Sequence, residues 1–219
     1  MLPADAPATD PPADADPARR HDDDPARRLL RGIAAAVADK GYAATTIADI
    51  VRHAHVSKRT FYEHFPDKQH CYLEAYRRGT NHLARLMVEA GTTADGPWRE
   101  RMRAALQAYL AVLVDRPAST LSFTTGIPAA GPEAIAARRA MHRRTAEALI
   151  AIVDHIRRDT TEIAPLRPVI AEAIVGALSE LVLNAVADGR IDDLPTLDGP
   201  ILELLSAVLT ATPTEDPAS

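Results

Sequence analysis

Residues 46–65, TIADIVRHAHVSKRTFYEHF, decide the fold of this chain. Thr46 with Asp49 three positions later is an acidic variant of the helix capping box, and Ser57 is a second typical N-cap residue. These caps predict two short helices, 46–53 and 57–64, joined only by residues 54–56. That spacing is typical of a helix-turn-helix, whose second helix enters the major groove of DNA.

The second predicted helix is rich in side chains that can donate hydrogen bonds to phosphates and base edges. Four of them form its first turn, and two more follow within the same short helix. These candidate DNA-binding residues are Ser57, Lys58, Arg59, Thr60, Tyr62 and His64. Phe61 and Phe65 are apolar, and we expect them to lie in the core.

Charge is unevenly distributed along the chain. The 219 residues carry a net charge of −5, yet residues 25–80 hold ten Lys or Arg against five Asp or Glu. Residues 1–24 and 81–219 are both acidic. A basic block can attract a polyanion through its local field, although a solvated face rich in arginine has the same composition. The helix-turn-helix spacing inside the block favours the polyanion.

The rest of the sequence predicts an all-α protein with disordered ends. Residues 1–24 hold five Pro, seven Asp and no aromatic residue, too little apolar surface to offset the entropy of ordering. We expect disordered tails at 1–24 and 213–219, a three-helix DNA-binding domain at 25–72 and a helical domain at 73–212. Periodicity and Pro or Gly boundaries predict helices from Pro25 to Gly41, from Asp67 to about Glu89, and over 97–115, 117–125, 132–159, 168–188 and 200–211.

Residues 28–72 resemble the DNA-binding domain of the tetracycline-repressor (TetR) family of bacterial transcription regulators. The matching residues are Ala36, Gly41, Tyr42, Thr46, Ile50, Val56, Ser57, Phe61, Tyr62, Phe65 and Lys68. The resemblance implies that Thr46, Tyr62 and Lys68 contact the DNA backbone. It also implies that Lys58, Arg59 and Thr60 lie where the family reads bases.

One position departs from the family pattern. His55 stands in the turn where the family usually has glycine, which is favoured because the turn requires positive φ. Histidine is among the better tolerated residues in that region of backbone space. We therefore expect the turn to form with His55 in the left-handed conformation.

The resemblance also implies a ligand pocket among the C-terminal helices. Aromatic residues and a few polar groups suit such a pocket, although each of them could equally be ordinary core. The candidates are Trp98, Met102, Tyr109, Phe123 and His142.

The last two predicted helices are apolar around most of their circumference. Residues 170–187 and 201–211 expose more apolar surface than one intramolecular contact requires. Dimerisation as a four-helix bundle explains this and agrees with the resemblance; burial within the same domain is the alternative.

Several other kinds of protein are disfavoured. Cys71 is the single cysteine, so no internal disulfide forms, and it is more typical of a core residue than of a nucleophile. His53, His55, His64 and His70 lack the spacing of a metal site. No phosphate-loop, nucleophile-elbow or zinc-protease motif occurs. We expect a cytoplasmic protein without cofactor, metal, membrane span or enzymatic activity.

The sequence thus predicts a homodimeric regulator that binds a palindromic double-stranded operator. The resemblance implies that it is a repressor and that an unknown small molecule releases it from DNA. Two other functions fit parts of the sequence. One is a helical ligand-binding protein or enzyme with a vestigial DNA-binding domain, against which the intact 57–62 segment argues. The other is an architectural protein with little sequence preference.

Overall fold

The computed structural model describes residues 24–211, and all regular structure in that range is helical. The predicted tails at 1–24 and 213–219 lie outside it, apart from Asp24. The elements are α2 (Pro25–Ala44), α3 (Ile47–Ala54), α4 (Lys58–His64), α5 (Lys68–Thr93), α6 (Trp98–Asp115), α7 (Pro117–Gly126), η1 (Pro128–Ala130), α8 (Pro132–Ile156), α9 (Pro168–Ala187), η2 (Ile191–Leu197) and α10 (Asp198–Leu209). The all-α prediction is confirmed.

The helix starts follow the caps in the sequence. The Asp24 side chain accepts a hydrogen bond from the backbone of Ala26, directly after the proline at the first helical position. Thr46 and Asp49 form a reciprocal capping box at the start of α3. Asp67 caps α5 by accepting from the backbone N–H of His70 at 2.8 Å.

The helix ends were predicted less well. Gly41 has φ 79°, so α2 breaks there as expected, but a further helical turn continues to Ala44. Helix α5 runs to Thr93 rather than Glu89, α8 stops at Ile156 rather than residue 159, and α10 starts at Asp198. The short 3₁₀ helices η1 and η2 were not predicted, because apolar periodicity does not mark such short elements.

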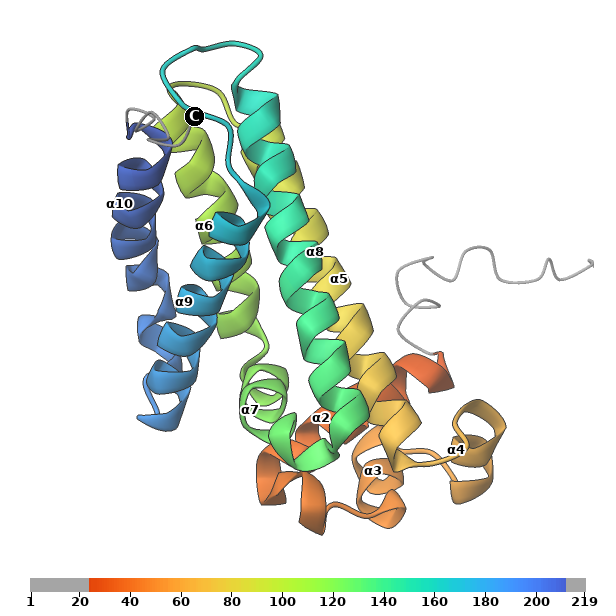
Figure 1. Cartoon of the computed structure of the whole chain (residues 1–219). Coiled ribbons are helices and arrows are strands. Elements are labelled where there is room, and N and C mark those ends of the chain that lie inside the picture. The colour runs from red at the N-terminus through yellow and green to blue at the C-terminus, as the bar shows by residue number, and fades with distance from the viewer. Residues whose placement is uncertain (1–23, 212–219) are drawn as a thin grey trace, which may run out of the picture.

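The molecule has two hydrophobic clusters joined by one long helix. Helices α2, α3 and α4 gather at one end of α5, while α6, α9 and α10 lie toward its other end (Figure 1). The first cluster includes Ile33, Ile50, Phe61 and Tyr72, all of them fully buried. It also contains Ala134 of α8, so it extends beyond the expected domain boundary at residue 72.

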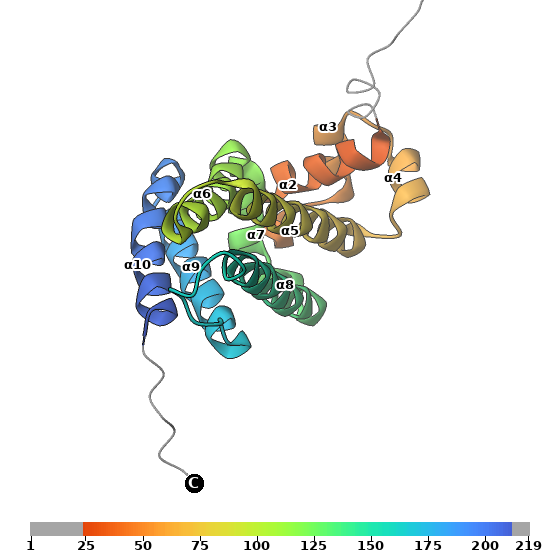
Figure 2. The ribbon, with the colours of Figure 1, turned by 90° about the horizontal axis from the view of Figure 1, so that it is seen from above.

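Helices α9 and α10 lie on the side of the molecule away from α4 (Figure 2). By length and composition, α9 is the one helix in the described range that is long and apolar enough to cross a membrane. It packs against α7, α8, η2 and α10, and 39% of its most apolar 18-residue window is buried.

Candidate nucleic-acid interface and internal cavity

The first helix of the helix-turn-helix, α3, is positioned by very close packing against α2. A Cβ added at Gly32 would lie 2.8 Å from the carbonyl oxygen of Ile50 and 2.9 Å from Cβ of Ala54. Real Cβ atoms do not come so close to backbone, so only glycine allows α3 this near to α2. Gly32 therefore positions α3, and the sequence alone gave no reason to single it out.

The turn between α3 and α4 has the geometry expected of it. His55 has φ 52° and ψ 46°, and it is the one non-glycine residue with positive φ in the described range. Its N–H donates to the carbonyl of Arg52, while the N–H of Val56 donates to that of Val51 at 3.1 Å. This is the Schellman arrangement that normally places glycine at the His55 position.

Arg28 of α2 forms hydrogen bonds with the C-terminal end of α3. Its Nε donates to the carbonyl oxygen of Ala54 at 2.9 Å, and its Nη2 donates to that of His55. A cation at a helix C-terminus also interacts favourably with the helix dipole. Arg28 thus connects the orientation of α2 to that of the turn that precedes α4.

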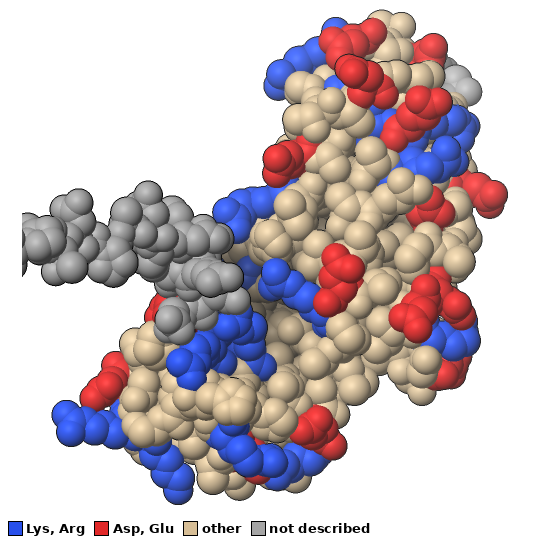
Figure 3. Space-filling model, turned by 180° about the vertical axis from the view of Figure 1, so that it is seen from behind, with Lys and Arg blue, Asp and Glu red and all other residues tan. Residues whose placement is uncertain are grey.

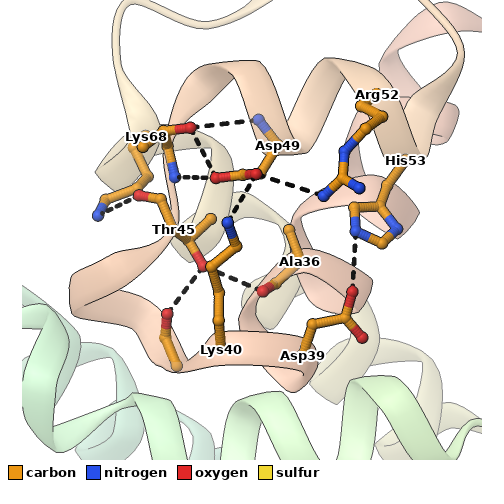
Figure 4. Close-up of polar contacts among 10 residues, drawn as sticks. Ala36, Asp39, Lys40, Thr45, Asp49, Arg52, His53 and Lys68 are labelled. Carbon is orange, nitrogen blue, oxygen red and sulfur yellow. Dashed lines mark hydrogen bonds and ion pairs between the residues drawn. The ribbon is translucent and has the colours of Figure 1, made fainter.

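Asp49 is the centre of an ionic cluster at the start of α3 (Figure 4). Its carboxylate accepts hydrogen bonds from the backbone and hydroxyl of Thr46 and lies 2.7 Å from Nζ of Lys40 and 3.3 Å from a guanidinium nitrogen of Arg52. The hydrogen bond from Lys40, followed by those from Thr46, lowers the pKa of Asp49 below its usual value. The cluster fixes α3 against the end of α2.

Lys68 joins the start of α5 to the end of α2. Its ammonium donates to the carbonyl oxygen of Thr45 at 2.9 Å (Figure 4). It also donates to the carbonyl oxygen of Tyr42 at 2.8 Å and lies 4.3 Å from the centre of the Tyr42 ring. Burial lowers the pKa of Lys68. The Thr45 hydroxyl in turn donates to the carbonyls of Ala36 and Gly41. Lys68 has this intramolecular role in addition to the DNA-backbone contact that the resemblance implies.

Helix α4 exposes most of its candidate DNA-binding residues. The Ser57 hydroxyl caps the helix by accepting from the backbone N–H of Thr60 at 3.0 Å, and the two hydroxyls are 2.9 Å apart. The Arg59 side chain is 89% exposed, and its Nε donates to Glu63 at 3.0 Å. Thr60 and Lys68 are half-buried, and the exposed candidates are Thr46, Ser57, Lys58, Arg59, Tyr62 and His64.

Tyr62 shows how this exposed surface is supported. Tyr62 is 59% exposed, and its ring packs edge-on against Phe61, with 5.5 Å between ring centres. Phe61 is fully buried, and Phe65 is 8% exposed, as expected. The core therefore fixes α4 from beneath while the polar side chains face outward.

The histidines near the turn are not assembled into a metal site. His53 Nε2 lies 3.0 Å from the carboxylate of Asp39, and His70 Nδ1 lies 2.9 Å from that of Asp67. Within residues 24–211 no group of three or more His, Cys, Asp or Glu side chains could hold a metal ion. Cys71 is buried, and this burial raises the pKa of its thiol to about 12.

A cavity of about 1910 Å³ opens between the helices of the C-terminal region. Of the candidate ligand-binding residues, Tyr109, Phe123 and His142 line it. Trp98 and Met102 do not; they lie in the core of the C-terminal cluster, 6% and 0% exposed. Both are near the start of α6, while the cavity reaches the other end of that helix, where Tyr109 lies. Both the core and the cavity wall contain apolar side chains, so apolar character in the sequence did not distinguish core residues from cavity-lining residues.

His142 gives the cavity wall a polar group. Its Nε2 lies 3.2 Å from the hydroxyl of Ser179 on α9. Burial, followed by the nearby charge of Arg138, lowers the pKa of His142 below 6.5. The ring is therefore predominantly neutral at pH 7 and can exchange hydrogen bonds with a bound molecule.

Comparison with known proteins agrees with this geometry. The sequence profile of the family described as bacterial regulatory proteins, tetR family, matches residues 29–75. The transcriptional activator FasR of Mycolicibacterium smegmatis is 35% identical over 83 residues, and this match spans 37% of each protein.

Solved structures share the fold over a much greater length. FadR of Bacillus subtilis, solved in complex with stearoyl-CoA, has a TM-score of 0.69 at 16% identity, with 82% of this chain and 96% of that chain covered. A structure described as a TetR-family regulator from Mesorhizobium loti has a TM-score of 0.68 at 20% identity, covering 90% and 100%. Residues 29–75 of the chain are thus similar to the tetR family of bacterial regulatory proteins, and the fold of the described range is similar to that of solved regulators of this family.

Proposed function

We propose that this protein is a sequence-specific DNA-binding transcription regulator whose affinity for its operator is controlled by a small molecule in the C-terminal cavity. The observation that carries the proposal is the exposed polar side of α4, held rigidly by the buried Phe61 beneath it and by the capped turn before it. A rigid helix with cationic and hydroxyl side chains at its start suits the major groove.

The candidate side chains fall into two groups, one for contacts to bases and one for contacts to phosphates. Lys58, Arg59 and Thr60 lie at the start of the helix, where they would reach base edges. Thr46, Tyr62 and Lys68 would contact phosphates on either side, with Ser57 and His64 at the margins of the same surface. Arg59 must break its ion pair with Glu63 to reach DNA, so the loss of this pair reduces the net free energy that Arg59 contributes to binding.

A second copy of the chain is the partner we propose for α9 and α10. Of the large hydrophobic side chains that are exposed in the described range, Val169, Leu181 and Leu204 are 65%, 37% and 40% exposed and lie on these two helices. A four-helix bundle of two α9–α10 pairs would bury them. Two copies related by a twofold axis would read a palindromic operator. Sedimentation equilibrium of the full chain tests this assembly.

The cavity supports control by a small molecule of amphiphilic character. Its size exceeds that of an ordinary drug-sized pocket, and FadR, which shares the fold, was solved with the long-chain thioester stearoyl-CoA. A ligand of that class would change DNA affinity only if it bound more tightly to one of two conformations. The expected repressor stays a prediction, since the partly matching FasR is named an activator.

A binding assay tests the proposal. A palindromic duplex from the promoter nearest to its own gene should bind to the full chain at low salt, and its affinity should fall steeply as salt rises. No binding by a folded protein at low salt would support the vestigial domain instead. Equal binding to unrelated duplexes would support an architectural protein. We also propose a cytoplasmic location, where such a regulator meets DNA.

A further inference from the structure

The lining of the cavity carries a large excess of positive charge. Two glutamates line it, Glu89 and Glu147, against seven arginines and two histidines. The arginines are Arg27, Arg31, Arg78, Arg85, Arg116, Arg138 and Arg144. An excess of this kind, beside a partly enclosed space, raises the local concentration of anions.

The lining arginines differ in whether a carboxylate pairs with them. Arg78 pairs with Glu74 at 2.6 Å. Among the described residues, by contrast, Arg85, Arg116, Arg138 and Arg144 form no ion pair within 4.0 Å. Guanidinium groups that line one cavity without carboxylate partners favour an anion that binds more than one of them.

Two of these arginines lie close to a histidine on the same wall. Burial lowers the pKa of His82, and the charges of Arg116 and then Arg85 lower it further. His82 belongs to α5 with Arg85, whereas Arg116 lies at the joint between α6 and α7. In Figure 3, basic side chains surround a hollow between the lower part of the molecule and the upper helices.

The interior of the cavity is apolar. Tyr109 lines it, and burial raises the pKa of its hydroxyl to about 12. Other apolar lining residues are Leu83, Val88, Val112, Phe123, Met141 and Val182. A molecule that matches both regions has a long apolar tail and a compact head with more than one negative charge.

The cavity also reaches the DNA-binding domain. Arg27 and Arg31 of α2 line it together with the arginines of α5 and α6. Arg28, between them in sequence, binds the carbonyls at the end of α3. Helix α2 also packs against α7. A molecule held by both groups of arginines would therefore act on the helix that orients the turn before α4.

We infer that the anionic head of the ligand is bound jointly by Arg85 and Arg116 of the regulatory domain and by Arg27 and Arg31 of α2, so that the ligand bridges the two domains. This inference rests on the proposed function and adds the chemistry of the ligand and the route of control. Bridging stabilises the packing of α2 against α5 that the structure shows, and a higher ligand affinity for this arrangement than for others is what couples ligand binding to DNA binding.

Calorimetric titration of the full chain with three probes that share a ten-carbon tail tests the head-group site. Decyl phosphate should bind most tightly, decanoate less tightly and decanol weakest, and added salt should weaken only the two charged probes. Arg85→Gln with Arg116→Gln should weaken decyl phosphate at least tenfold and leave decanol unchanged. Arg143→Gln, on an exposed residue of α8 outside the cavity lining, is the matched control. Equal affinity for all three probes, or no effect of the paired substitution, would overturn the inference.

The bridge is tested by the ratio of DNA affinities with and without decyl phosphate. In the natural chain this ratio should differ clearly from one, and in the Arg27→Gln, Arg31→Gln variant it should approach one. A variant that keeps the full ratio overturns the bridge even though the proposed function stands. If the natural chain binds no DNA at all, the proposed function fails instead, and calorimetry still decides the head-group site.

Discussion

The hydroxyl of Tyr72 on α5 donates a 2.6 Å hydrogen bond to the carbonyl oxygen of Ser122 on α7. Tyr72 is fully buried, and a Cβ added at Gly126, one turn after Ser122, would lie 2.5 Å from its hydroxyl and 3.1 Å from Val37 of α2. Helix α7 is therefore closely packed against the DNA-binding domain at Gly126, where no larger side chain fits. A shift of α7 must move α2, α5 or both.

Loss of this hydrogen bond should weaken the protein measurably. Tyr72→Phe leaves the buried ring in place and removes the donor, so we expect the free energy of unfolding to fall by about 1 kcal/mol. Urea denaturation measures this change in the free energy of unfolding. Tyr62→Phe removes a hydroxyl from an exposed ring and should leave stability within about 0.5 kcal/mol. Equal stability of the natural chain and Tyr72→Phe would show that the bond contributes nothing.

His55 offers a stabilising substitution. His55→Gly should raise the free energy of unfolding by up to about 1 kcal/mol, because a left-handed conformation at φ 52° is strained for any side chain and free of strain for glycine. Thermal melting measures the gain, and operator binding should be retained. His55→Ala, which keeps a Cβ, should show no such gain. A lower melting temperature for His55→Gly would mean that the histidine side chain stabilises the turn.

Gly32 should tolerate no side chain. Gly32→Ala places a methyl group 2.8 Å from the Ile50 carbonyl and should cost about 1–3 kcal/mol through overpacking of α3 against α2. Gly199→Ala is the matched control, since a Cβ there meets nothing within 4 Å. Chemical denaturation of both variants makes the comparison. A neutral Gly32→Ala would contradict the close packing of these helices.

Substitutions on α4 can distinguish contacts to bases from contacts to phosphates. Lys58→Ala or Arg59→Ala should weaken operator binding by about 1–3 kcal/mol if the side chain makes a bidentate base contact. Glu63→Gln should strengthen binding, because it releases Arg59 from its 3.0 Å ion pair and removes a negative charge near the DNA. Fluorescence anisotropy on operator and random duplexes measures both effects. An equal loss on both duplexes would assign the substituted residue to phosphate contact.

The ionic cluster of Asp49 predicts a response to acid. Its folded pKa lies below the ordinary 3.8, so its contribution to stability is fully present above pH 3.8 and is lost as the pH falls through the lower folded value. Asp49→Asn should therefore be less stable than the natural chain at pH 7, and the difference should shrink below pH 3.8. Urea unfolding at a series of pH values follows this difference. A difference that stayed constant into acid would contradict the ionic role.

The sequence predicted those features that depend on residues close together in the chain. Thr46, Asp49 and Ser57 specify helix starts by themselves. The left-handed conformation at His55 was expected from the resemblance, since the family usually has glycine at this position of the turn. The arginines around the cavity could not be found in this way, because Arg27 and Arg116 line the same cavity only after the helices have packed together. Local pattern likewise did not separate Met102, which is core, from Tyr109, which lines the cavity.

Lys68 shows the same limit inside the DNA-binding domain. The sequence predicted its position at the start of α5. Its hydrogen bonds to the Tyr42 and Thr45 carbonyls could not be predicted, because they depend on where the end of α2 lies. Arg28 was missed for the same reason, since its partners are 26 and 27 positions away. Long-range partners of charged side chains require the fold to be known.

Selection of bound duplexes from a random library, using the full chain and reading the pool by sequencing, tests the central claim most directly. The account predicts convergence on one motif of two inverted half-sites about 34–36 Å apart, and loss of that motif with Lys58→Ala, Arg59→Ala. A folded protein that enriches no motif, or one that enriches the same motif after both substitutions, would contradict it.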